Sequence, residues 1–256
     1  FPEVKSEALQ AMILLSRAAP GEVHMHIKSL VEASLCAARH QHSRIRQKSI
    51  STAGELLLYC SEGLSSVMEK IVLPAFERLP FDASSSVRQT AVDVLAQCLA
   101  RLHSRHEYSA NLFQILLSLL GDATDSISQR ALQRLEWISR YIEEENSSDK
   151  MQIEGDEDIS TDTLVAAEAA SMPPGKDVHP KQEETPRWKD MKLANDMFPK
   201  PFKTRPSNCL REYARTMWSK TLRLTLRDLG DWTTGKRSFA ALQLRSMLVL
   251  CESYCT

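Results

Sequence analysis

The residues best suited to chemistry lie between Gly230 and Arg237, where the sequence reads Gly-Asp-Trp-Thr-Thr-Gly-Lys-Arg. The spacing of the glycines and the lysine is that of a phosphate-binding loop. Such a loop needs Ser or Thr after the lysine to hold magnesium, and here Arg237 follows Lys236. It also follows a buried strand, whereas residues 221–229 carry charges at helical spacing. We therefore interpret the segment as a turn between two helices and expect no nucleotide or other cofactor.

Other groups that could hold a metal or act in catalysis do not form complete sets. Histidines occur in close pairs at 24 and 26, 40 and 42, and 103 and 106, but zinc needs three or four converging ligands. Cys251 and Cys255 lie one helical turn apart with the same shortage of further ligands. No Gly-x-Ser-x-Gly motif is present. The sequence predicts no metal site, no catalytic residues and no enzyme.

Basic residues outnumber acidic residues in the last fifty positions of the chain. Two readings of this charge stay open, because a run of charges does not by itself name a partner. It is either a surface for an acidic partner or for the chain's own acidic stretch, or a solvated face combined with Asp–Arg contacts between neighbouring repeats. The candidates for a partner-binding basic face are Arg211, Arg215, Arg223, Lys236 and Arg237.

Composition sets the class of protein. Of the 256 residues, 43% are hydrophobic and 25% are charged, as in ordinary globular proteins. A net charge of −1 gives no overall attraction to nucleic acid or to an anionic membrane, and no apolar run reaches the roughly 20 residues of a membrane helix. Six cysteines are too few for a disulfide framework and indicate the reducing cytoplasm. We expect the chain, which begins at Phe1 without a signal peptide, to be a piece of a longer protein.

The sequence contains a repeat of roughly forty residues, and this repeat must position the charged side chains described above. A β-branched residue is followed by a base and, four positions later, by a small residue; Asp82 and Asp122 each precede such a unit by five positions. Arg46 and Arg88 are the clearest bases, and we interpret them as contacts between adjacent repeats. The helices that open with this pattern are expected to start near Val4, Ile45, Val87 and Ile127. Stacking buries the apolar stripes of such helix pairs, so the prediction is an all-α protein, an α-solenoid, whose repeat resembles the HEAT type.

The expected domain organisation has three parts. Residues 1–143 form the HEAT-type array. Residues 144–206 are acidic and then rich in proline, with seven of the eleven prolines between 173 and 206. Such a segment buries too little apolar area to offset its ordering entropy, so we predict a disordered insertion. Residues 207–256 form a further helix pair, in which Lys236 stands at the β-branched position.

Several segments carry a more specific resemblance. Residues 23–31, 40–46, 209–213 and 228–237, with their His-Gln-His and Asp-Trp turns, resemble the HEAT-repeat axonemal dynein assembly factors. The resemblance implies a cytoplasmic, non-enzymatic scaffold or chaperone cofactor that helps to preassemble dynein arms for motile cilia. It implies axonemal dynein heavy or intermediate chains and other assembly factors or chaperones as partners, with no nucleic acid and no membrane. The alternative is a generic HEAT-repeat cargo adaptor or nuclear import receptor.

Overall fold

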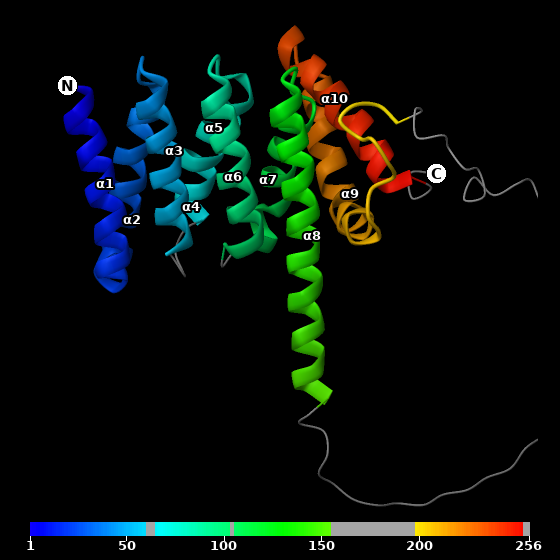
Figure 1. Cartoon of the computed structure of the whole chain (residues 1–256), viewed down its shortest axis with the longest axis horizontal. Helices are drawn as coiled ribbons and strands as arrows, with labels where there is room; N and C mark the ends of the chain where they lie inside the picture. The colour runs from blue at the N-terminus through cyan, green and yellow to red at the C-terminus, as the bar shows by residue number, and fades with distance from the viewer. Residues whose placement is uncertain (60–64, 103–104, 155–197, 253–256) are drawn as a thin grey trace, which may run out of the picture.

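The computed structural model describes residues 1–59, 65–102, 105–154 and 198–252, and every regular element in these ranges is helical. Figure 1 shows the helices side by side in one array that runs from α1 to α10. The predicted all-α solenoid is confirmed. A first row of helices consists of α1 (Pro2–Ala18), α3 (Ser43–Leu58), α6 (Ser85–Arg101) and α8 (Asp125–Glu154). None of the helices in these ranges is both long and apolar enough to cross a membrane.

A second row packs against the first. It consists of α2 (Pro20–Cys36), the broken helix α4 (Ser65–Val67), η2 (Met68–Val72) and α5 (Leu73–Phe76), and α7 (Arg105–Leu120). Short 3-10 turns η1 (Ala37–Arg39) and η3 (Leu79–Phe81) lead from this row back to the first. Each β-branched residue that the sequence singled out lies in the first turn of a first-row helix: Val4 in α1, Ile45 in α3, Val87 in α6 and Ile127 in α8.

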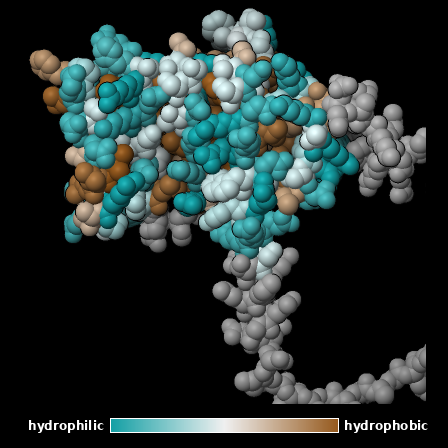
Figure 2. Space-filling view, viewed as in Figure 1, coloured by the Kyte–Doolittle hydropathy of each residue, from teal (hydrophilic) through white to brown (hydrophobic). Residues whose placement is uncertain are grey.

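The core lies between the two rows. The apolar stripe of α6 is buried, from Val87 through Ala91 and Leu95 to Leu99. First-row helices approach one another closely, because a Cβ added at Gly54 of α3 would lie only 2.6 Å from Val94 Cγ1 of α6. On the face shown in Figure 2, apolar side chains gather mainly over the N-terminal helices, and the rest of the face is largely hydrophilic.

Arg–Asp contacts join the middle repeats, as the sequence predicts. Arg46 donates to both carboxylate oxygens of Asp82, at 2.7 and 2.8 Å, and to the carbonyl of His40 at 2.8 Å. Arg88 repeats this arrangement with Asp122, at 2.6 and 3.3 Å, and with the carbonyl of Asp82 at 2.7 Å. Burial disfavours the charged form of Asp82, but its bonds to Arg46 and to the N–H of Ser84 hold the pKa of that carboxyl below its usual range.

The second row bends at Pro74. Proline has no N–H, and its ring clashes with the carbonyl four residues earlier. The N–H of Leu73 donates to the carbonyl of Met68, five residues back, and the turn immediately before Pro74 is therefore a π-turn. The helix widens at this point and divides into α4, η2 and α5.

The last pair, α9 (Asn208–Leu229) and α10 (Thr234–Cys251), does not extend both rows in register. Helix α10 packs against α9 and α7, and in the described chain it makes no comparable contact with α8. Polar contacts join both helices of the pair to α7: Gln243 Nε2 of α10 donates to Ser118 Oγ at 2.6 Å, and Gln114 Nε2 donates to Asp228 of α9 at 2.8 Å.

The segment before α9 occupies the side of α8 that a fifth first-row helix would need. Gln129 Nε2 donates to the carbonyl of Pro201 at 2.8 Å, and the N–H of Ser207 donates to Glu136 at 3.2 Å. Phe202 is buried. Gln129 and Glu136 lie on the side of α8 away from Arg130, which pairs with Asp93 of α6. The segment that leads into α9 therefore occupies the place beside α8 that a regular fifth unit would take.

The predicted insertion, 144–206, differs from the structure at both ends, and its residues 155–197 lie outside the described residues. The acid-rich stretch after residue 143 continues α8 as far as Glu154, because glutamate is a good helix former. At the other end, Phe198 and Phe202 pack against the hydrophobic core and anchor the chain. The boundary at 144 therefore lies inside α8, whereas the boundary at 206 falls just before Ser207, the N-cap of α9.

Candidate partner-binding surfaces

Most of the five predicted basic residues are held within the fold. Arg211 pairs with Glu252 at 2.6 Å, and Arg215 pairs with Glu212 at 2.7 Å. Lys236 lies 3.3 Å from Asp231, and Arg237 Nη1 donates to the carbonyls of Asp231 and Trp232 at 3.0 and 2.9 Å. Arg223 has no ion-pair partner in the described part of the chain. The charge of most of these residues is therefore already compensated.

These residues also do not form one compact face. Arg211 lies in the first turn of α9, whereas Lys236 lies in the first turn of α10, which begins beside the end of α9. The rise of α9 therefore places Arg211 and Lys236 about 20 Å apart along that helix. Burial raises the pKa of Glu252, but Arg205 and Arg211 outweigh it and hold that pKa below its usual value. A partner-binding basic face stays a prediction, and only Arg223, Lys236 and Arg237 could share one end of the helix pair.

The chemical motifs of the sequence have structural positions. Gly235 and Lys236 lie inside the first turn of α10, and the element before them is the helix α9. The rings of His40 and His42 lie 5.3 Å apart. In the ranges that the structure describes, no group of three or more His, Cys, Asp or Glu side chains is placed to hold a metal ion.

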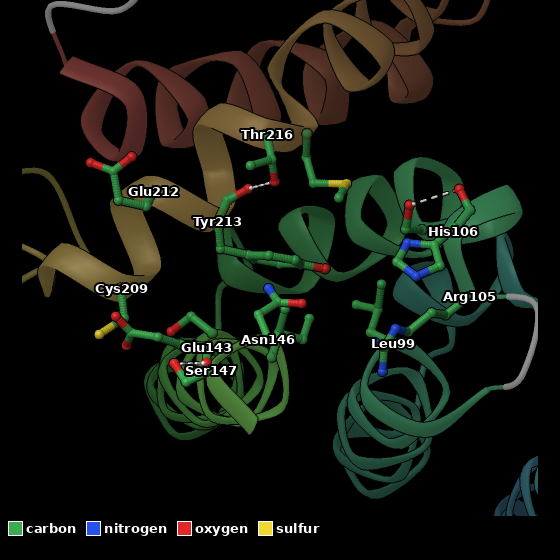
Figure 3. Close-up of a pocket in the computed structure, with 14 residues that line it drawn as sticks. Leu99, Arg105, His106, Glu143, Asn146, Ser147, Cys209, Glu212, Tyr213 and Thr216 are labelled. Atoms are coloured by element: carbon green, nitrogen blue, oxygen red, sulfur yellow. Dashed lines mark hydrogen bonds between the residues drawn. The ribbon is translucent and has the colours of Figure 1, made fainter. Parts of the chain in front are cut away.

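A cavity of about 520 Å³ opens where four helices meet. It lies between the end of α6, the start of α7, the middle of α8 and the start of α9, and Figure 3 shows the ring of Tyr213 reaching into it. The lining residues labelled there include Leu99, Arg105, His106, Glu143, Asn146, Cys209, Glu212 and Thr216. Sequence reasoning did not find this cavity, because its lining comes from four helices and follows no motif.

Two polar groups in this cavity have raised pKa values. Burial raises the pKa of the Tyr213 phenol, so the hydroxyl stays neutral, and it has no hydrogen-bond partner among the described residues. The Cys209 thiol is hydrogen-bonded to Glu143 and partly buried. Both effects raise the pKa of this thiol, so it is not a nucleophilic thiolate at neutral pH. Arg105 is engaged by Glu145 at 2.5 Å and by the carbonyl of Ala100 at 2.8 Å.

Comparison with known proteins points to one family. The family model described as "Dynein axonemal assembly factor 5-like, TPR repeats" matches residues 1–152. A Xenopus laevis protein named dynein axonemal assembly factor 5 is 32% identical over 149 residues, which are 58% of this chain and 17% of the relative. The mouse and human proteins of the same name are 27% and 25% identical over all 256 residues, a quarter of each relative's length. No solved structure gives a significant match.

The matched region ends close to the end of α8, so it coincides with the stacked rows α1 to α8. The family description names TPR repeats, which have a period of about 34 residues, whereas the roughly forty-residue period and the Arg–Asp contacts between repeats are closer to the HEAT type. Both types are helix pairs that stack into a solenoid. The chain spans a quarter or less of the curated relatives that it matches.

Proposed function

This chain belongs to the dynein axonemal assembly factor 5-like family, and on that basis we propose that it is part of a non-enzymatic scaffold that helps to preassemble axonemal dynein arms in the cytoplasm for motile cilia. The proposed partners are axonemal dynein heavy or intermediate chains, together with other assembly factors or chaperones. The single observation that carries the proposal is the match of the family model to the whole stack from α1 to α8.

The architecture supports a scaffold. In a solenoid each repeat contacts only its neighbours, so the stack offers an extended surface to a large partner. The cavity beside Tyr213 offers a neutral hydroxyl and protonated thiol, and these groups are suited to holding a partner segment.

The test is affinity purification of the full-length protein from cells that are building motile cilia, with mass spectrometry of the co-purifying proteins. We expect axonemal dynein chains and co-chaperones. Recovery of a nuclear import GTPase with basic nuclear cargo, and no dynein, would instead support an import receptor and overturn the proposal.

A charge-reversal variant tests the predicted basic face in the same experiment. Arg223→Glu with Lys236→Glu changes two exposed side chains near one end of the last helix pair. Lys28→Glu with Lys5→Glu is the matched control on α2 and α1, where both side chains are also exposed. Loss of dynein chains from the first variant alone would place a contact at α9 and α10, and equal recovery from both variants would remove this face from the proposal.

A further inference from the structure

A second groove lies in the second row, between the end of α2 and the broken helix that follows α3. Its volume is about 610 Å³. Leu35 and Ile71 form its apolar floor together with Leu79, which is the first residue of η3. Leu35 and Leu79 are buried, and Ile71 is half-buried.

The groove exists because the two rows pack differently. In the first row, α3 and α6 approach so closely that Gly54 has no room for a Cβ next to Val94. In the second row, the main contact between α2 and the described part of the broken helix is with η2. Lys70 and Ile71, which both line the groove, lie in the π-turn before Pro74, and π-turns of this kind are frequent at functional sites.

The rim of the groove is positively charged. Arg39, Lys70 and Arg78 line it, are exposed, and have no ion-pair partner in the described ranges. Two carboxylates also line the groove. That of Asp82 is already bound by Arg46 through two hydrogen bonds, which leaves Glu32 as the acidic group facing three cations.

We propose that this groove binds an acidic amphipathic segment of a protein partner. Apolar side chains of that segment would cover Leu35, Ile71 and Leu79, and its carboxylates would reach the three rim cations. The long stems of arginine and lysine extend the apolar floor while their charges stay in solvent. The inference rests on the proposed function only in that the segment belongs to a protein that the scaffold holds.

The test measures binding of a fluorescein-labelled helical peptide of about 15 residues, with leucine at every third or fourth position and glutamate elsewhere. The same peptide with lysine in place of glutamate is the probe control. We expect the acidic peptide to bind the 256-residue chain and the basic peptide not to bind. Raising the salt concentration should weaken binding, because ion pairs between the peptide and the rim cations are exposed to solvent and are screened by salt.

Two variants with equal charge change locate the site. The groove variant carries Arg39→Glu, Lys70→Glu and Arg78→Glu. The matched control carries Lys5→Glu on α1, Arg140→Glu on α8 and Lys220→Glu on α9, three exposed residues that do not line the groove. Loss of three rim ion pairs predicts binding about tenfold weaker or worse for the groove variant and little change for the control. Equal weakening in both variants would mean non-specific attraction and would overturn the proposal.

Cys36 provides an independent readout, because its exposed side chain lines the same groove. Bound peptide should slow alkylation of Cys36 by iodoacetamide, measured by peptide mapping, and leave the rate at Cys209 in the other cavity unchanged. Binding that leaves Cys36 unprotected would overturn the site. Peptide binding at the groove, with no dynein in the affinity purification, would support the groove and refute the assembly role. Dynein in the purification, with no peptide binding at the groove, would support the assembly role and overturn the groove.

Discussion

Arg88→Met tests whether the Arg–Asp contacts hold the repeats together. The Arg88 guanidinium bonds to Asp122, to the carbonyl of Asp82 and to Thr124 Oγ1, the last at 3.2 Å. Only 15% of the Arg88 side chain and 6% of the Asp122 side chain are exposed. The substitution therefore leaves a carboxylate largely out of water, with the N–H of Thr124 as its remaining donor at 2.8 Å.

The expected loss is about 3 kcal/mol in the free energy of unfolding. Breaking a buried ion pair by removing one partner destabilises a protein by about 3–5 kcal/mol, because an uncompensated charge stays buried. We take the lower end, since Thr124 still donates to the carboxylate. Methionine retains most of the apolar stem of arginine, so lost packing adds little.

Urea unfolding followed by circular dichroism gives the global value, and native-state hydrogen exchange shows whether α6 and α8 lose protection first. The exchange measurement matters because repeat arrays can unfold in parts. The control is Arg227→Met, which removes a partner of Asp228 at 3.3 Å, where 63% of the arginine side chain is exposed. It should change stability by less than about 0.5 kcal/mol.

A loss below about 1 kcal/mol for Arg88→Met, or one equal to that of the control, would refute the argument that this pair is buried and stabilising. The double variant Arg88→Met with Asp122→Leu removes both charges. It should recover a large part of the lost stability, since replacing both partners of a buried pair by apolar groups is often close to neutral.

Three further outcomes are expected. Arg46 and the N–H of Ser84 lower the pKa of Asp82 in the folded protein, against the effect of burial. The ionised Asp82 carboxylate therefore stabilises the fold fully above the ordinary carboxyl pKa of about 3.9, and this contribution is lost as the pH falls through the lower pKa of the folded state. Melting temperatures from pH 6 down to about 2.5 should fall less steeply for Asp82→Asn than for the unchanged chain. Gly54→Ala should destabilise by about 1–3 kcal/mol in urea, since the new Cβ meets Val94 at 2.6 Å, and an unchanged midpoint would show that the helices separate freely. Tyr213→Phe should leave the urea midpoint unchanged or raise stability by up to about 1 kcal/mol, because the buried hydroxyl has no partner among the described residues; a loss above that size would show that the hydroxyl is bonded.

The repeats could be predicted because their signals are local. A β-branched residue, a base and a preceding aspartate at constant spacing indicate where a helix starts and which side it buries. The structure places Arg46 against Asp82 and Arg88 against Asp122, as this spacing indicates. The same spacing also indicated a regular fifth unit at Lys236, and here the structure differs. Ser128 replaces the base that would bind Asp231, and the chain around Pro201 covers that side of α8.

The candidate sites were harder to predict than the fold. The charge of residues 207–256 was visible in the sequence, but its compensation by Glu252, Glu212 and Asp231 depends on which side chains meet in space. The cavity beside Tyr213 and the groove above Leu35 lie between helices. Neither has a motif, because each gathers single residues from separate turns and helices.

The sequence by itself determined the all-helical class, the period of the repeat and the Arg–Asp contacts, because each depends on residues at constant separations along the chain. Only the tertiary structure decided where the array departs from regularity. The return of residues 198–207 onto α8 and the Gln243 network with α7 displaced the last pair, and the π-turn before Pro74 opened the second row while the first row stayed closed. These features depend on how surfaces from distant parts of the chain fit together, and periodicity in a sequence carries no information about that fit.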